Sequence, residues 1–442
     1  MNNTLVKQVS KAMQRVLIEK ADKLAIRSGF IKRRVKITGS KFCQTLVMGW
    51  LNKPEASLEE LSQTAVVTGL NITAQGLEQR FTKDAAEFMQ IMLEETISEV
   101  IQTEAVTIPI LKRFKGVYLN DSSTISLPNE LSTVWMGSGN SKGGGEAALK
   151  LEIRLNILEG NIEGPILVSG RTNDRKAAAK YKSLPKGSLS IADLGYWKLG
   201  DLKDKTNDGV YWLSRLRVGT VIFNELGERL SLAKLLDKHN AKHLEMNIFL
   251  GLQHKLRARL LAFRVPLKVA KERQSKLKRS AKKKMQKVSQ ERLAMSGWSI
   301  FVMNIPNALL APKEIIALAR MRWQIELIFK LWKSHGQIDK SRSKKPWRIL
   351  CEVYSKLIAM IIQQWTFLIG HWVFPDKSLV KASKTVRQHA LNLTISLRNL
   401  KRLKEALTIL SNCLESGCRI NKSLKNPRTF QLLLALDNLD SS

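Results

Sequence analysis

The chain has 442 residues and a formal net charge of +35, with a sequence isoelectric point near 10.2. So large a positive charge predicts a polyanionic partner, for which nucleic acid is the usual candidate and an anionic membrane surface the alternative. A hydrophobic content of 44% excludes a disordered basic tail, because it is enough to build a folded core.

Residues 1–110 are predicted to be helical. Ser57-Leu-Glu-Glu60 has the spacing of a capping box, which begins a helix that runs toward Val67. After a break at 68–71, Thr73 is suited to cap a second helix. This second helix contains Gln75, Gln79 and Arg80. Two short helices around a glycine-containing turn, preceded by the basic segment 27–41, favour a region that binds DNA ends through a helix-turn-helix, with an ordinary helical bundle as the alternative.

From residue 111 to 217 the pattern changes to strands. Gly116–Asp121 is typical of a short apolar strand that ends on an acid, and Ser188–Asp193 is a second one. The alternating segment Leu149–Leu158, with its return through Pro165–Val168, predicts a hairpin. Gly209–Arg217 predicts a further strand.

Two other features are expected in this region. Short helices are predicted around 176–183 and 196–203. Gly137–Gly145 is so rich in glycine that we expect a mobile loop.

Residues 218–297 are interpreted as an inserted domain. Its strand-like pieces are Thr220–Phe223 and Leu260–Val265, and Leu232–Lys242 between them is more helical. It ends in a basic run from Lys268 to Lys287, for which a solvated helix and a contact with nucleic-acid backbone are both open interpretations.

Residues 298–345 contain a core strand, Trp298–Met303, and then the most informative stretch, Arg320–Lys333. This stretch has no Gly or Pro and is rich in helix formers, so it predicts one helix. Its polar residues recur at intervals of four, four and three, which puts them on one face. They are Arg322, Glu326, Lys330 and Lys333. One acid among three cations suits a metal ion next to phosphates, and a solvated stripe of ion pairs is the alternative.

Residues 346–442 are predicted to be helical, and suit either contact with another protein or packing of the chain's own core. Leu357–Phe374 is the strongest candidate for a membrane span, but its two glutamines and one histidine favour a buried helix. Cys43, Cys351, Cys413 and Cys418 lack the spacing of a zinc site. We therefore expect reduced thiols and a cytoplasmic protein without a membrane segment.

Three acids stand out when these elements are taken together. Asp121 and Asp193 follow apolar strands, and Glu326 lies on a helix. Carboxylates on separate elements that converge are what phosphodiester cleavage with two divalent ions requires. Oxygen ligands suit Mg²⁺ or Mn²⁺. The pattern suggests an α/β fold with an RNase H-like core, a large insertion and flanking helical regions. Asp174 and Asp201 are the local alternatives to Asp193, although neither ends an apolar strand.

The residues from Gly116 to Lys333 resemble the IS-four group of bacterial insertion-sequence transposases, which are DDE enzymes with an RNase H-like core. Four blocks in the same order carry this resemblance: Leu119–Pro128, Ile191–Trp197 with Tyr211–Leu216, Trp298–Pro306, and Arg322–Glu326 with Lys333. In one respect the chain departs from the group's Tyr-Arg-Glu-Lys signature, because Ala319 occupies the tyrosine position. That departure puts the activity of this copy in question.

The resemblance implies a role for each matched residue. Asp121, Asp193 and Glu326 would be catalytic and would bind two Mg²⁺ ions, which Mn²⁺ would replace. Arg322, Lys330 and Lys333 would hold the DNA backbone at the transposon end. Trp298 would stack on an unstacked base, with core packing as the alternative that the residues themselves leave open.

The resemblance also implies the reaction and the partners. The protein would cleave at transposon ends and join them to target DNA in a cut-and-paste pathway. Its partners would be the terminal inverted repeats, target DNA and a second copy of the chain, in a bacterial cytoplasm and associated with the nucleoid. Two alternatives stay open: a catalytically weakened descendant that only binds DNA, and a basic packaging or membrane-surface protein.

Overall fold

The computed structural model describes residues 2–33, 36–103, 105–106, 108–137, 146–372 and 376–420. The chain divides into two compact units. Unit 1 holds the described residues of Met1–Ile108, Asp121–Lys180 and the chain from Trp323 onward, and unit 2 holds Pro109–Asn120 and Tyr181–Arg322. The mobile loop expected at Gly137–Gly145 falls, from residue 138 on, outside the described residues.

The described strands form a ten-stranded sheet in the order β3-β2-β1-β4-β5-β10-β9-β8-β6-β7. In chain order they are β1 Val117–Ser126, β2 Ala148–Asn156, β3 Asn161–Ser169, β4 Leu189–Ala192, β5 Tyr211–Arg215, β6 Ile222–Phe223, β7 Arg229–Leu230, β8 His243–Leu250, β9 Leu256–Arg264 and β10 Trp298–Met303. With the helices described below, this makes a mixed α/β protein.

Strand direction divides the sheet into two parts. β1 pairs in parallel with β4, and β4 with β5. From β5 onward the pairs are antiparallel, and β10, β9, β8, β6 and β7 continue the sheet in that order. The segment 218–297 therefore adds its strands to the edge of the sheet next to β10, including β8, which the sequence patterns did not reveal.

Most of the predicted strands are confirmed, with one correction. The hairpin is formed by β2 and β3, and the strands expected before Asp193 and at Trp298 are β4 and β10. The first strand, however, does not end at Asp121 but continues to Ser126. The first four residues of β1 are buried. Its second half consists of small and β-branched side chains, most of which are partly or fully exposed, and β-branched residues favour strands.

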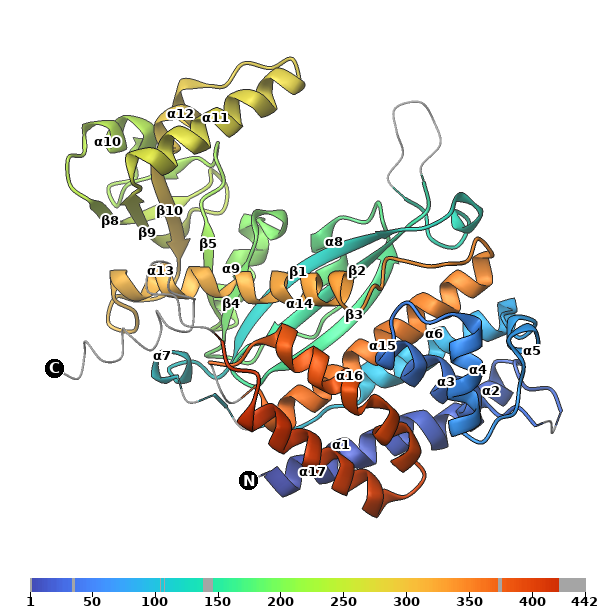
Figure 1. Ribbon diagram of the computed structural model, residues 1–442. Coiled ribbons are helices and arrows are strands. Elements are labelled where there is room, and N and C mark those ends of the chain that lie inside the picture. Colours follow the sequence, from blue (N-terminus) through green and yellow to red (C-terminus); the bar gives the residue numbers. More distant parts are fainter. Residues whose placement is uncertain are drawn as a thin grey trace. The chain divides into compact units, whose positions relative to one another are not determined.

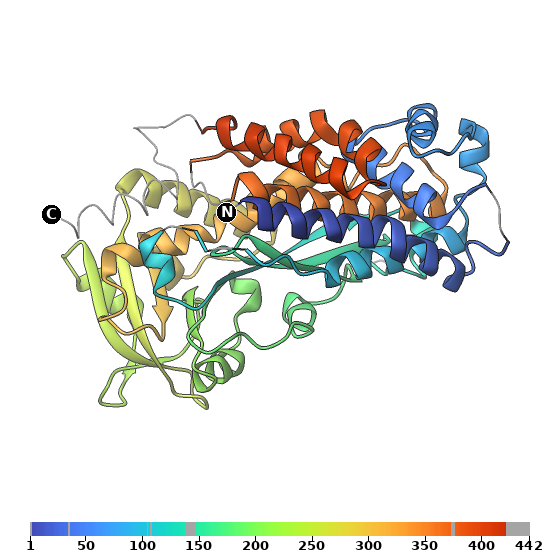
Figure 2. The same ribbon diagram turned by 90° about the horizontal axis from the view of Figure 1, so that it is seen from below.

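Unit 1 contains a bundle of helices that lie side by side in both views (Figures 1 and 2). The helical elements of unit 1, in the bundle and outside it, are α1 Asn2–Gln14, a π-helical segment Arg15–Lys20, α2 Ala21–Arg27, α3 Gly39–Asn52, α4 Leu58–Val67, α5 Ala74–Glu78, α6 Lys83–Ser98, a 3-10 turn Asn129–Leu131, α8 Asp174–Ala178, α14 Trp323–Ser334, α15 Pro346–Gly370, α16 Leu379–Ser396 and α17 Leu400–Ser416.

The centre of this bundle is α15. Every residue of α15 from Ile349 to Gly370 is buried, and the helix packs against α3, α6 and α17. The expectation of a buried core helix in place of a membrane span is thus confirmed. No helix in the described ranges is long and apolar enough to span a bilayer.

The helix signals read near the N-terminus are confirmed. The Ser57 side chain accepts a hydrogen bond from the Glu60 amide, and the Glu60 carboxylate accepts one from the Ser57 amide at 2.8 Å. Thr73 caps α5 in the same way through the Gly76 amide. The second helix is shorter than expected, because α5 ends at Glu78.

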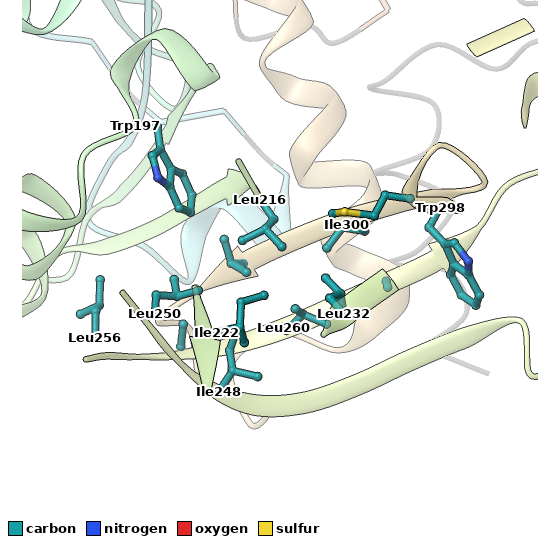
Figure 3. Packing of buried hydrophobic residues seen from close by; sticks show 14 of the residues in the cluster. Trp197, Leu216, Ile222, Leu232, Ile248, Leu250, Leu256, Leu260, Trp298 and Ile300 are labelled. Carbon is teal, nitrogen blue, oxygen red and sulfur yellow. The ribbon is translucent and has the colours of Figure 1, made fainter. Parts of the chain in front are cut away.

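Unit 2 has its own hydrophobic core, to which β5, β6, β8, β9 and β10 contribute. Its helices are α7 Pro109–Lys112, a 3-10 turn Leu194–Tyr196, α9 Leu199–Asn207, α10 Leu232–Lys238, α11 Leu267–Lys283, α12 Gln290–Met295 and α13 Pro312–Met321. Figure 3 shows aliphatic side chains from β6, β8, β9 and β10 gathered in this core, with Trp197 and Trp298 among them.

All four cysteines are free. Burial raises the pKa of the Cys43 and Cys351 thiols well above the ordinary value, which disfavours the reactive thiolate. These two residues are therefore apolar core residues.

Candidate functional site

The helix expected from Arg320 to Lys333 is two helices. α13 ends at Met321, α14 begins at Trp323, and Arg322 lies between them. Arg322 itself keeps right-handed helical backbone angles, so the interruption involves neither glycine nor proline, and the residue pattern gave no sign of it. Glu326, Lys330 and Lys333 remain on one helix, as predicted.

The two aspartates occupy equivalent positions on neighbouring parallel strands. Asn120 of β1 is paired in register with Ala192 of β4, and this is the last pair of the ladder. Asp121 is the next residue of β1, and Asp193 directly follows the end of β4. In parallel strands the carboxyl ends point to one edge of the sheet, which is where α/β proteins assemble their sites.

The Asp121 carboxylate accepts a hydrogen bond from the Ser122 amide at 2.9 Å. The Ser122 hydroxyl in turn donates to Asp174 at 2.8 Å, and Asp174 forms an ion pair with Lys150 at 2.9 Å. Asp174, one of the alternatives to Asp193, is therefore engaged by a cation. The other alternative, Asp201, is paired with Lys198.

Along α14 the polar stripe faces outward while the opposite side is buried. Glu326 and Lys333 are half-buried and Lys330 is exposed, whereas Ile328 and Trp332 lie in the core. The Lys333 ammonium donates to the Thr124 carbonyl of β1 at 2.8 Å, which fixes the end of α14 beside that strand.

Asp121 and Glu326 belong to unit 1, and Asp193 belongs to unit 2. Throughout the described ranges, no three His, Cys, Asp or Glu side chains are gathered closely enough to hold a metal ion. Convergence of the three acids therefore stays a prediction.

Trp298 begins β10 and is only 7% exposed. Its ring belongs to the core of unit 2, and the Arg264 guanidinium lies 4.7 Å from the ring centroid. This environment supports core packing. Stacking of Trp298 on a base, which also stays a prediction, requires Arg264 and the neighbouring side chains to move away from the ring.

Sequence reasoning missed a group of buried charges that hold the end of α14. The Lys356 ammonium of α15 pairs with Glu352 at 2.7 Å and donates to the carbonyls of Gln337 and Lys340 at 3.0 and 2.8 Å. Glu352 also accepts from Ser341 at 2.6 Å. The available signal was a glutamate and a lysine four residues apart in a largely apolar helix.

The two helices predicted around residues 68–71 are present as α4 and α5 with a turn between them, and their action as a DNA-binding helix-turn-helix stays a prediction. The turn is held by the Arg398 guanidinium, which donates to the Thr68 carbonyl, and α5 by Arg348, which pairs with Glu78 at 2.6 Å. The side chains of Gln75, Gln79 and Arg80 are exposed. A contact of these three residues with DNA stays a prediction.

Comparison with known proteins gives a consistent result. The model of the family described as Transposase DDE domain matches residues 112–362, more than half of the chain. The transposase for insertion sequence element IS231B of Bacillus thuringiensis subsp. berliner is 27% identical over 93% of this chain and 91% of its own length. The transposase for insertion sequence element IS1151 of Clostridium perfringens is 26% identical, over 86% and 83%.

Proposed function

The chain belongs to the Transposase DDE domain family, and from this premise we propose that it cuts DNA at transposon ends and joins them to target DNA. The observation that carries the proposal is the register of β1 and β4, in which Asp121 and Asp193 follow the last pair of two parallel strands. With Glu326 they form the acidic triad of the reaction.

The donor chemistry fits divalent ions. Three carboxylates supply only hard oxygen ligands, which suit Mg²⁺, with Mn²⁺ as a substitute, and do not suit the N and S ligand sets of zinc. Two such ions, when bound, activate the attacking oxygen and stabilise the leaving oxygen of a phosphodiester. In this proposal Asp121, Asp193 and Glu326 would hold them.

The cations of the stripe bind the DNA backbone. Lys330 is exposed and free to reach a phosphate, and Lys333 is oriented by its hydrogen bond to Thr124. Together with Arg322 they offset the negative charge that develops on the phosphoryl oxygens. Cleavage and joining are both phosphoryl transfers, so one set of residues serves both.

The same proposal assigns roles to the remaining regions of the chain. The order β3-β2-β1-β4-β5 at one side of the sheet supports an RNase H-like core, and the strands of 218–297 extend that core as its insertion. Residues 1–110 bind the transposon end, through the exposed side chains of Gln75, Gln79 and Arg80 among others. Two copies of the chain act together on paired terminal repeats in the cytoplasm.

The test is cleavage of linear duplexes that carry candidate inverted repeats taken from the DNA on both sides of the gene. With Mg²⁺, the unchanged protein is expected to nick at the repeat boundary, and Asp121→Asn, Asp193→Asn and Glu326→Gln are each expected to lose nicking while they still bind DNA. Asp201→Asn is the matched control, because that half-buried acid is ion-paired with Lys198, and the variant should retain full activity.

Ala319 gives a specific reason to consider a second function. If the unchanged protein binds the repeats and never nicks them, the chain is a transposase-derived DNA-binding protein. Equal binding to unrelated DNA without nicking would contradict both functions.

A further inference from the structure

The most basic surface of unit 2 is one helix. α11 carries eight lysine and arginine residues and a single glutamate, Glu272, over 17 residues. None of its residues is buried. Figure 1 shows it beside α12, at the Trp298 end of β10.

The helix is attached along one side only. Its half-buried residues recur at helical spacing and form a single stripe, which consists of Val269, Ala270, Arg273, Gln274, Leu277 and Ala281. Arg273 anchors this stripe by donating to the Trp298 carbonyl at 3.0 Å and to the Ser299 hydroxyl at 3.1 Å. Burial against β10, followed by repulsion from Arg215, lowers the pKa of Arg273.

The other cations are all exposed, and most lie on the face opposite this stripe. They are Lys268, Lys271, Lys276, Lys278, Arg279, Lys282 and Lys283. In the part of the chain that the structure describes, none of these seven side chains has an ion pair or a hydrogen bond. They extend over about 22 Å, since an α-helix rises about 1.5 Å per residue.

This arrangement weakens the isolated helix. Lys278 and Lys282 are like charges four residues apart, and Lys268 and Lys271 are three apart, which costs a few tenths of a kcal/mol for each pair. The first turn of α11 has no acid and its N-terminus has no side-chain cap, so the positive end of the helix dipole is also uncompensated. Because most of these losses of helix stability come from excess positive charge, we infer that the charge has a function.

We propose that the outer face of α11 binds the phosphate backbone of duplex DNA without regard to sequence. This inference rests on the proposed function for the identity of the polyanion, but it concerns binding alone. A row of exposed cations on a rigid helix matches a duplex, whose phosphates are regularly spaced and bind through charge. In this proposal α11 makes no contact with base edges.

The experiment measures binding of the full chain to two labelled duplexes, one ending in the terminal repeat and one scrambled, over a range of salt concentrations. The test variant is Lys271→Gln/Lys278→Gln/Lys282→Gln. The matched control removes three exposed cations from helices of unit 1, as Lys384→Gln/Lys401→Gln/Arg402→Gln. Lysine-to-arginine substitutions at the three α11 positions test whether charge alone suffices.

In the test variant, the slope of log affinity against log salt is expected to become shallower by about 2 to 3, because each phosphate contact contributes about 0.9. Affinity at about 0.1 M salt should fall at least about 10-fold, equally for both duplexes.

Three results would overturn the inference: an unchanged slope, an equal effect of the unit 1 control, or a loss confined to one of the two duplexes. Failure of the inference is separate from failure of the proposed function. A protein that nicks normally with an unchanged slope contradicts only the role of α11. One that never nicks but shows the expected change of slope contradicts only the transposase chemistry.

Discussion

Acidification is predicted to destabilise unit 1 through one buried histidine. His371 directly follows α15, is 4% exposed and lies 5.3 Å from the Phe367 ring centroid. Among the described residues, neither of its ring nitrogens has a hydrogen-bond partner of good geometry. Burial lowers the pKa of His371 to about 4, and the Ser378 backbone only partly opposes this change.

The sign and size of the effect follow from linkage. Because the folded-state pKa of about 4 lies below the ordinary 6.5, the unfolded chain binds more protons between these values, and stability is lost as the pH falls. Between pH 7 and pH 5 the loss from this group is about 2 kcal/mol. For a domain of 150–250 residues that corresponds to roughly 4 to 8 °C in the thermal midpoint.

The assay compares thermal unfolding of the unchanged protein and of His371→Leu at both pH values. Leucine has a similar volume and no ionisable group. Between pH 7 and pH 5 the thermal midpoint of the variant should therefore fall by about 4 °C or more less than that of the unchanged protein. If both proteins lose the same amount between pH 7 and pH 5, His371 is not held in its neutral form and the reasoning is refuted.

Three further changes test other parts of the account. Lys356→Met should lower the stability of unit 1 by about 3–5 kcal/mol, because it leaves Glu352 charged and buried, and adding Glu352→Leu should restore most of the loss in a thermal unfolding series. Ser57→Ala should cost about 1 kcal/mol by removing the cap of α4, which the same series measures. Lys333→Ala should slow nicking by about 10- to 100-fold at saturating DNA, whereas Lys333→Arg should retain most of the rate. If Lys356→Met or Ser57→Ala is as stable as the unchanged protein, or if Lys333→Ala nicks at the unchanged rate, the corresponding contact is contradicted.

Local signals predicted much of this fold. The capping box at Ser57 needs only residues three apart, and the β2–β3 hairpin needs only alternation on both sides of a turn. The buried nature of α15 followed from its composition. In each case the physical cause lies within one element, so the sequence pattern contains it.

Features that depend on tertiary packing were missed. The break between α13 and α14 at Arg322 has no glycine or proline to signal it. β8 was also missed, although His243–Ile248 alternates polar and apolar residues, so tertiary packing does not explain that omission. The role of Lys356 depends on carbonyls of the segment after α14, which its own helix does not reveal.

The candidate site shows the same division. The spacing on α14 predicted the shared face of Glu326, Lys330 and Lys333, because helical geometry fixes it. Strand composition led to Asp121 and Asp193, but their equivalent positions depend on the register of β1 with β4. The burial of Trp298 depends on neighbours distant along the chain, so its ring was left with two interpretations.

The central claim is that Asp121, Asp193 and Glu326 together hold two divalent ions, and counting bound Mn²⁺ by electron paramagnetic resonance tests it most directly. In complex with a terminal-repeat duplex, the unchanged protein is expected to bind two Mn²⁺ per chain whose spectra show that the ions are neighbours. Asp193→Asn should lose at least one of them. An unchanged Mn²⁺ count in that variant, or no such pair in the unchanged protein, would contradict the claim.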